Sequence, residues 1–199
     1  IQCNPGCPPG RKLRVNMFSW PQNMIMVGFD GKRFIAEDSR RDQMRDAILA
    51  LPKQTAFCIQ DDYGQSLNNV GHQKDNLKGL ETGDAWRADT LEELAKKAGI
   101  DPANLVKTIE EYNKGCEVGQ DVGGKKPHNL RKIEKAPFWA GYAGMSVHHT
   151  MGGVVINTDT QVIDRHGQVI PGLHAVGEVT GGIHGSCLLY TSPSPRDRG

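Results

Sequence analysis

The chain has 199 residues, of which 24 are lysine or arginine and 23 are aspartate or glutamate, so its formal net charge is +1. A balance this close to neutral gives no electrostatic basis for binding nucleic acid or an anionic membrane surface, and we expect no nucleic-acid partner. No apolar run approaches the roughly 20 residues of a membrane-spanning helix, and the length allows one core or two small ones.

The cysteines predict no metal site. Cys3 and Cys7 lie close together beside Pro and Gly, but no second CxxC and no histidine pair completes a set of ligands. We expect Cys3, Cys7, Cys58 and Cys116 to be reduced structural thiols. Cysteines scattered in this way leave the compartment open, cytoplasmic or periplasmic.

The first part of the chain predicts a hairpin, a helix and a strand. MIMVGFDGKRFI alternates apolar residues on both sides of Asp30-Gly31, a dipeptide that suits a tight turn between two antiparallel strands. RRDQMRDAILALP predicts a helix that is closed by Pro52. Its apolar face consists of Met44, Ala47, Ile48 and Leu51. TAFCIQDD follows as a short buried strand.

The middle of the chain predicts two capped helices. In DTLEELAKKAGIDPANLVKTIEEYNKG, Thr90 and Glu93 form a capping box and Gly99 ends the first helix. Asp101 and Pro102 begin the second helix. The apolar stripes are Leu91, Leu94 and Ala98 on the first helix and Leu105, Ile109 and Tyr112 on the second. The Gly/Lys-rich stretch EVGQDVGGKKPHN is expected to be a surface loop.

The last third predicts mainly strands. GGVVINTDTQVIDRHGQVIPGLHAVGEV contains three short β runs separated by turns and then a strand, LHAVGE. Strands, then helices, then strands indicate an α+β chain in which residues 1–147 form one piece and residues 148–186 return to a separate sheet domain.

The end of the chain, CLLYTSPSPRDRG, has a different character from the glycine-rich segment before it. Residues 187–197 back-translate into a sequence that resembles a transposon-end adapter used in DNA sequencing. We therefore expect 187–199 to be a non-native tail, with a disordered Pro/Ser tail as the alternative. Because the chain opens on Ile1 instead of Met, we also expect an internal piece of a longer enzyme.

Three stretches carry candidate chemistry: SRRD at 39–42, HHTMGG at 148–153 and GEVTGGIHGS at 177–186. Adjacent histidines followed by Thr, Met and two glycines combine hydrogen-bond donors with backbone that a flat group can approach. Taken singly, a histidine pair is more often structural, and a glycine cluster also serves as a plain turn.

Five motifs in order, GKRFIAEDSRRD, DTLEELAKKAGIDPANLVKTIEEYN, APFWAGYAG, HHTMGGVVI and IPGLHAVGEVTGGIHGS, closely resemble the flavoprotein reductases of the fumarate reductase and flavocytochrome c family. The resemblance covers residues 1–186. It implies FAD as cofactor, a capping (substrate-clamp) domain over 1–147, and the returning β part of a Rossmann-like FAD-binding domain over 148–186.

The resemblance also implies a reaction and its catalytic residues. The family reduces an activated C=C bond: hydride passes from N5 of FAD to the β-carbon of an unsaturated acid, and an arginine protonates the α-carbon. Arg41 in SRRD matches that arginine, and His148 matches the histidine that binds the substrate carboxylate or carbonyl. Without the motif, Arg41 would be interpreted as a surface ion pair with Asp38 or Asp42.

Cofactor contacts are implied in both glycine-rich motifs. Those expected along the flavin are His149, Thr150, Met151, Gly152 and Gly153. Glu178 matches the glutamate that touches the FAD ribose, and the neighbouring glycines are Gly177, Gly181 and Gly182.

Several positions depart from the dicarboxylate-reducing members. Asn4 in IQCNPG replaces a histidine that helps to hold the second carboxylate of fumarate. Counted without a gap, Asn16 and Met17 replace a Thr and a Glu of the pocket and proton path, and Trp20 replaces a relay Arg. We therefore expect a bulky enoate or enone instead of fumarate, with Asn4, Asn16 and Trp20 among its contacts. The alternative is that Met17, Phe18 and Trp20 are core residues.

Two further alternatives stay open. One is a flavin dehydrogenase of the 3-ketosteroid type, for which Tyr142 is the nearest candidate base; the other is an inactive module that retains only the cap fold. The expected partners are a small unsaturated acid or enone and an electron donor of unknown kind: haem, quinone or reduced flavin. The family's GxGxxG and clamping arginine do not occur in the sequence, so we expect this piece alone to bind FAD poorly and to turn over nothing.

Overall fold

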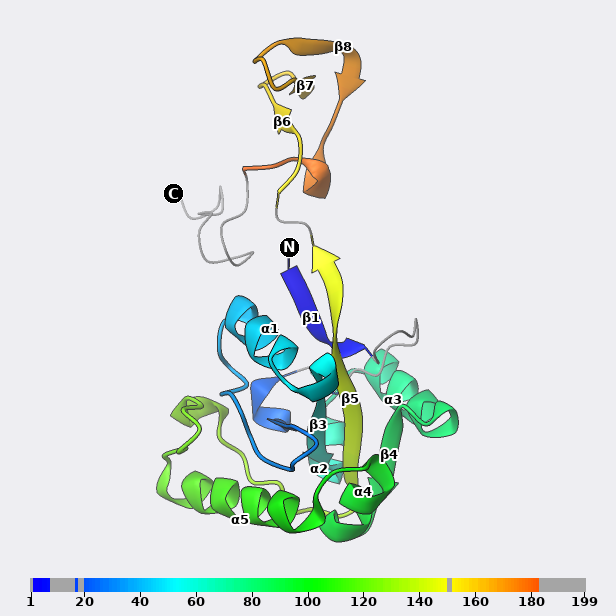
Figure 1. Cartoon of the computed structure of the whole chain (residues 1–199), viewed down its shortest axis with the longest axis vertical. Helices are drawn as coiled ribbons and strands as arrows, with labels where there is room; N and C mark the ends of the chain where they lie inside the picture. Colours follow the sequence, from blue (N-terminus) through cyan, green and yellow to red (C-terminus); the bar gives the residue numbers. More distant parts are fainter. Residues whose placement is uncertain (1, 8–16, 18–19, 150–151, 183–199) are drawn as a thin grey trace. The chain divides into compact units, whose positions relative to one another are not determined.

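The computed structural model describes residues 2–7, 17, 20–149 and 152–182, and of residues 2–7 and 146–149 it describes the backbone alone. The chain divides into two compact units, Asn4–Ser146 (the larger unit) and Ile1–Cys3 with Val147–Gly199 (the smaller unit). Figure 1 follows the chain from β1, in blue, to β8, in orange. The tail at 187–199 lies outside the described residues.

A five-stranded sheet forms the centre of the larger unit. Its strands are β1 (Gln2–Cys7), β2 (Ile25–Val27), β3 (Thr55–Asp61), β4 (Ala85–Ala88) and β5 (Phe138–His149). They follow the order β1-β5-β3-β2, and β4 also pairs with β5. The β2–β3, β3–β5 and β4–β5 pairs are antiparallel, with Cys58 of β3 opposite Met26 on one side and Gly141 on the other.

Helices and short turns connect these strands. They are α1 (Arg41–Leu49), α2 (Asp62–Ser66), α3 (Val70–Thr82), α4 (Leu91–Ala98) and α5 (Pro102–Val118), with the 3-10 turns η1 (Pro21–Asn23), η2 (Pro52–Gln54) and η3 (Pro127–Asn129). A further 3-10 turn, η4 (Gly177–Val179), belongs to the smaller unit. In the part of the chain that is described, no helix is both long and apolar enough to cross a bilayer.

The sheet carries a core on each face. Successive side chains of a strand point to opposite faces, so Phe57 and Ile59 of β3 pack with α4 and α5. Ala56 and Cys58 of the same strand pack with α1 and with Met17. All seven residues of β3 are buried, as the sequence predicted.

Both capped helices are confirmed. The Thr90 hydroxyl accepts the Glu93 backbone N–H at 3.2 Å, and the Asp101 carboxylate accepts that of Asn104 at 2.8 Å. Gly99 ends α4 in the left-handed conformation, with φ 74°. The buried stripe of α5 includes Leu105, Ile109 and Tyr112, as predicted.

The predicted hairpin is only half formed. Its turn is present, since Gly31 N–H donates to the Gly28 carbonyl at 3.0 Å, but the expected second strand is reduced to a single bridge between Val27 and Arg33. The reason lies in the Met26 N–H, which donates to the Glu37 carboxylate at 2.9 Å. A side chain thus takes the place of a partner strand.

The smaller unit contains an antiparallel sheet of β6 (Val155–Ile156), β7 (Gln161–Ile163) and β8 (Val169–His174), in that order. The prediction of a separate final strand, LHAVGE, is wrong. Leu173 and His174 already belong to β8, and Gly177, at φ 75°, turns the chain into η4.

Candidate functional site

Within the smaller unit, the two glycine-rich motifs lie against each other. Val154, directly after HHTMGG, forms a parallel bridge with Thr180 of GEVTGG. The Val154 N–H donates to the Val179 carbonyl at 3.0 Å, and the Gly181 N–H donates to the Val154 carbonyl at 2.9 Å. The structure therefore joins two motifs that are separated by the whole β6–β8 sheet in sequence.

Backbone packing explains two of the glycines. A Cβ on Gly153 would lie 1.9 Å from the Val179 carbonyl oxygen, and a Cβ on Gly181 would lie 2.8 Å from the Gly153 oxygen. Any side chain at either place would force the two segments apart. Gly153 and Gly181 are thus required by the contact between the motifs.

The other glycines of the motifs are in open surroundings. Among the described residues, and leaving aside the adjacent residues of the chain, no atom lies within 4 Å of a Cβ built on Gly152, Gly177 or Gly182. Gly177 and Gly182 need glycine for their positive φ of 75° and 82°. Neither a clash with described atoms nor a positive φ explains glycine at position 152, and its contact with the flavin stays a prediction.

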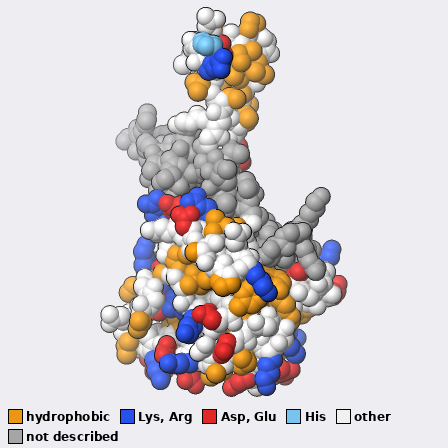
Figure 2. All heavy atoms as spheres, viewed as in Figure 1, with side chains coloured by type: hydrophobic (Ala, Val, Ile, Leu, Met, Phe, Trp, Pro, Cys, Tyr) orange, Lys and Arg blue, Asp and Glu red, His pale blue; other side chains and the backbone are white. Residues whose placement is uncertain are grey.

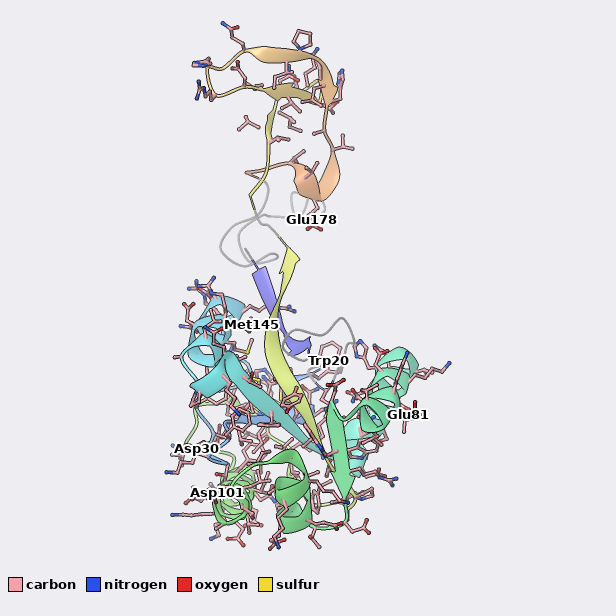
Figure 3. The ribbon with its side chains drawn as sticks, turned by 45° about the vertical axis from the view of Figure 1, so that its right-hand side comes forward. Trp20, Asp30, Glu81, Asp101, Met145 and Glu178 are labelled. Carbon is pink, nitrogen blue, oxygen red and sulfur yellow. The ribbon has the colours of Figure 1, made fainter. Side chains whose placement is uncertain are left out.

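Glu178 lies beside this glycine cluster, in η4. The turn is closed by Thr180, whose N–H and hydroxyl both donate to the Gly177 carbonyl, at 3.1 and 2.7 Å. The Glu178 side chain is exposed, and Figure 3 shows it projecting away from the three-stranded sheet. A carboxylate held on a closed turn is suited to accepting hydrogen bonds from a ribose hydroxyl.

Arg41 is the first residue of α1 in the larger unit. Both neighbouring carboxylates are engaged by other groups. Asp42 accepts two hydrogen bonds from Arg40, at 3.1 and 2.6 Å, and Asp38 accepts from the Lys126 N–H and the Asn129 side chain, each at 2.8 Å. Figure 2 shows basic and acidic side chains side by side over α1.

Other predicted contacts fall where side chains are not described. The backbone of Asn4 lies in β1, and the backbones of His148 and His149 end β5. Asn16, Thr150 and Met151 lie outside the described residues. The roles of all six stay predictions.

The two described residues of the VNMFSW stretch, Met17 and Trp20, differ in burial. Met17 is 1% exposed and belongs to the core against α1, so the core interpretation of this residue is correct. Its carbonyl accepts a hydrogen bond from the buried Gln60 side chain at 2.8 Å. Trp20, three residues later, is 60% exposed (Figure 3).

Tyr142 packs within an aromatic cluster of the core. Its ring centroid is 5.2 Å from that of Phe57 and 4.9 Å from that of Trp86. Apolar packing on both sides gives no support to Tyr142 as a catalytic base.

One cluster of charged side chains was not predicted from the sequence. Arg33, Glu37, Asp121 and Lys125 form a chain of ion pairs with N–O distances of 2.6 to 3.0 Å. The stretch around Lys125 was expected to be a surface loop, yet the Lys125 side chain is fully buried. The only signal in the sequence is the pair of acids, Glu37 and Asp38, just before SRRD.

Metal and thiol chemistry find no support in the described part of the chain. No group of three or more His, Cys, Asp or Glu side chains there is placed to hold a metal ion. Cys58 and Cys116 are free thiols, and burial raises the pKa of both, so neither is activated.

Comparison of the sequence with known proteins gives consistent matches. Residues 9–190 match the family model described as FAD binding domain. The chain is 38% identical over 179 residues to an NADH:acrylate oxidoreductase of Vibrio harveyi, 40% over 166 residues to a fumarate reductase (cytochrome) of Shewanella frigidimarina, and 34% over 187 residues to a urocanate reductase of Eggerthella lenta. These matches cover 90, 83 and 91% of this chain but only 18, 28 and 30% of the relatives, so the chain spans less than a third of their length.

Solved structures agree. The open conformation of a flavocytochrome c3 fumarate reductase matches with a TM-score of 0.73 at 34% identity, covering 92% of this chain and 31% of that one. A 3-ketosteroid delta1-dehydrogenase from Sterolibacterium denitrificans matches with a TM-score of 0.63 at 25% identity, covering 90% of this chain and 37% of that one.

Proposed function

The chain belongs to the FAD binding domain family, whose cofactor is FAD, and on this premise we propose that it is part of an ene-reductase acting on unsaturated acids other than fumarate. Acrylate, fumarate and urocanate, for which the three relatives are named, all carry a C=C bond conjugated to a carboxylate. That common feature supports the reaction class.

Two residues of this chain would carry the reaction. The bound flavin supplies the hydride. Arg41 holds the proton for the α-carbon: a guanidinium is a poor acid toward water but an adequate one toward a developing carbanion. His148 donates to the carboxylate or carbonyl oxygen on which negative charge develops.

Asn4–Ser146 would act as a capping domain that closes over the substrate and excludes water. This unit has a hydrophobic core on each face of its sheet. These cores support the capping role, because they make the unit stable enough to move as one body.

The observation that carries the choice of substrate is the exposed indole of Trp20. The resemblance implies a relay arginine at this position and an acidic residue at the position of Met17, which is buried. An indole can cover an aromatic or aliphatic substituent but offers no charge to a second carboxylate. We therefore assign the enzyme to bulky monocarboxylic enoates, with enones as the next class.

The test uses the full-length flavoprotein that contains this chain, assayed without oxygen with a reduced viologen as electron donor. We expect kcat/KM for urocanate or cinnamate to exceed that for fumarate by about tenfold or more. Trp20→Ala should lower kcat/KM for cinnamate by about tenfold and leave acrylate unchanged. Fumarate as the best substrate would contradict the assignment.

The alternatives are weaker. The ketosteroid dehydrogenase match supports a related fold, but the candidate base Tyr142 lies in the aromatic core. Against an inactive module, Gly153 and Gly181 give no evidence of a flavin site, because packing explains both glycines. Titration of the full-length protein with FAD distinguishes a flavoenzyme from an inactive module, since only the module would bind no FAD.

A further inference from the structure

The buried cluster of Arg33, Glu37, Asp121 and Lys125 contacts the segments next to Trp20 and Arg41, the two residues to which the proposed function gives roles. The exposed fractions of the side chains are 11% for Arg33, 0% for Glu37, 3% for Asp121 and 0% for Lys125. Two cations balance two anions, so the cluster is buried without net charge.

Glu37 is fully satisfied by hydrogen bonds. One carboxylate oxygen accepts from the Met26 N–H at 2.9 Å and from Arg33 Nε at 3.0 Å. The other accepts from Arg33 Nη2 at 2.8 Å and lies 3.0 Å from Lys125 Nζ. This carboxylate ends the hairpin after β2 and fixes the chain four residues before Arg41.

Lys125 connects Glu37 to two other segments. Its Nζ donates to the carbonyls of Pro21 and Met24, each at 2.8 Å, and lies 3.3 Å from the Tyr112 hydroxyl of α5. Pro21 directly follows Trp20. One ammonium group therefore holds the segment after Trp20, the segment before Arg41, and α5.

The loop at 121–129 also holds the next acid. Asp38 accepts from the Lys126 N–H and from the Asn129 side chain, both at 2.8 Å. Asp38 itself lies in a turn in which the Ser39 N–H donates to the Ala36 carbonyl at 3.0 Å, and α1 begins two residues after Ser39. No flexible spacer separates these contacts from Arg41.

Stability alone gives little reason for such a cluster. Removing two pairs of charges from water costs several kcal/mol per ion, so buried ion pairs often stabilise a fold no more than apolar residues of equal volume. Buried ion pairs do fix the relative placement of the segments that they join, because each hydrogen bond is satisfied in only one arrangement of those segments. Catalysis by a fixed proton donor needs this kind of placement.

We propose that Lys125 is a positioning residue, which holds the segments of Arg41 and Trp20 in one fixed frame. It touches neither substrate nor cofactor in this role. The proposal rests on the proposed function where it names Arg41 as proton donor and Trp20 as substrate contact.

The first experiment needs no activity. Amide hydrogen exchange of the 199-residue chain is compared between wild type, Lys125→Met and Glu37→Gln. We expect exchange in residues 38–44 to rise at least tenfold in both variants while α4, which lies outside the cluster, stays protected. Asp61→Asn is the matched control, because Asp61 forms another buried ion pair, with Arg131 at 2.8 Å. Unchanged protection of 38–44 in both cluster variants would overturn the proposal.

The second experiment measures turnover of the full-length flavoprotein. In Lys125→Met we expect kcat to fall by about ten- to a hundredfold with KM nearly unchanged, since a small misplacement of a catalytic group costs that much. Asp61→Asn should keep kcat within about twofold. If Lys125→Met does not fold, Glu37→Gln decides, because it retains the volume of the side chain. If the wild-type enzyme is active and both Lys125→Met and Glu37→Gln keep its full kcat, the positioning role of Lys125 is contradicted. If the wild-type enzyme is inactive, only the proposed function is contradicted, and the hydrogen-exchange experiment alone tests the role of Lys125.

Discussion

Single residues in one motif can be glycine for different reasons. Gly153→Ala would bring a Cβ to 1.9 Å from the Val179 carbonyl oxygen, whereas Gly152→Ala meets open space. We expect Gly153→Ala to destabilise the protein by about 1–3 kcal/mol or more. Gly152→Ala should leave stability within about 0.5 kcal/mol and weaken FAD binding. Urea unfolding and flavin titration measure the two effects, and equal stability of both variants would refute the packing explanation.

Asp61 is expected to make stability depend on pH. Burial alone would raise its pKa, but the Arg131 guanidinium and the N–H groups of Gly64 and Glu134 hold the pKa below its usual value. A lowered pKa in the folded state gives stabilisation that is complete above the usual Asp pKa and is lost as pH falls through the folded-state pKa. The free energy of unfolding should therefore decline on acidification, and less steeply in Asp61→Asn. Parallel declines would contradict this role.

Among the elements, the turn at Asp30-Gly31 packs on the start of α5, and Figure 3 shows Asp30 near Asp101. The Asp101 N–H donates to the Phe29 carbonyl at 3.0 Å, and a Cβ on Gly31 would lie 2.7 Å from the Leu105 nitrogen. Gly31→Ala combines this clash with the cost of φ 73°.

Gly99 at the end of α4 is the matched comparison, because it has φ 74° and open space around its Cβ position. We expect Gly99→Ala to cost about 1–2 kcal/mol and Gly31→Ala at least twice as much, measured by thermal and urea unfolding. Similar losses would show that the turn does not depend on contact with α5.

Elements whose signals are local were predictable from sequence. The caps Thr90 and Asp101 and the burial of all of β3 follow from neighbouring residues. The strand expected after Gly31 failed because the Met26 N–H is taken by Glu37, 11 residues away. The buried Lys125 was missed for the same reason: its partner Glu37 lies 88 residues earlier, and a lysine in a polar loop gives no sign of it.

The larger unit has a hydrophobic core on each face of its sheet and contains the ion pairs of Lys125 with Glu37 and of Arg131 with Asp61. We therefore expect residues 4–146 to fold when expressed alone and to unfold in one cooperative transition. Calorimetry and circular dichroism of that piece test this, with the whole chain as reference. A broad, uncooperative transition would show that the unit needs the rest of the chain.

In the proposed reaction, Arg41 of this chain supplies the proton for the reduction of an unsaturated acid. The most direct measurement is kcat of the full-length flavoprotein carrying Arg41→Gln, with Arg45→Gln, on the same helix and ion-paired with Asp46, as control. We predict that Arg41→Gln lowers kcat by about a hundredfold to ten-thousandfold, the usual contribution of a positioned acid, and that Arg45→Gln leaves it nearly unchanged. An Arg41→Gln enzyme that turns over as fast as the control would show that Arg41 is not the proton donor.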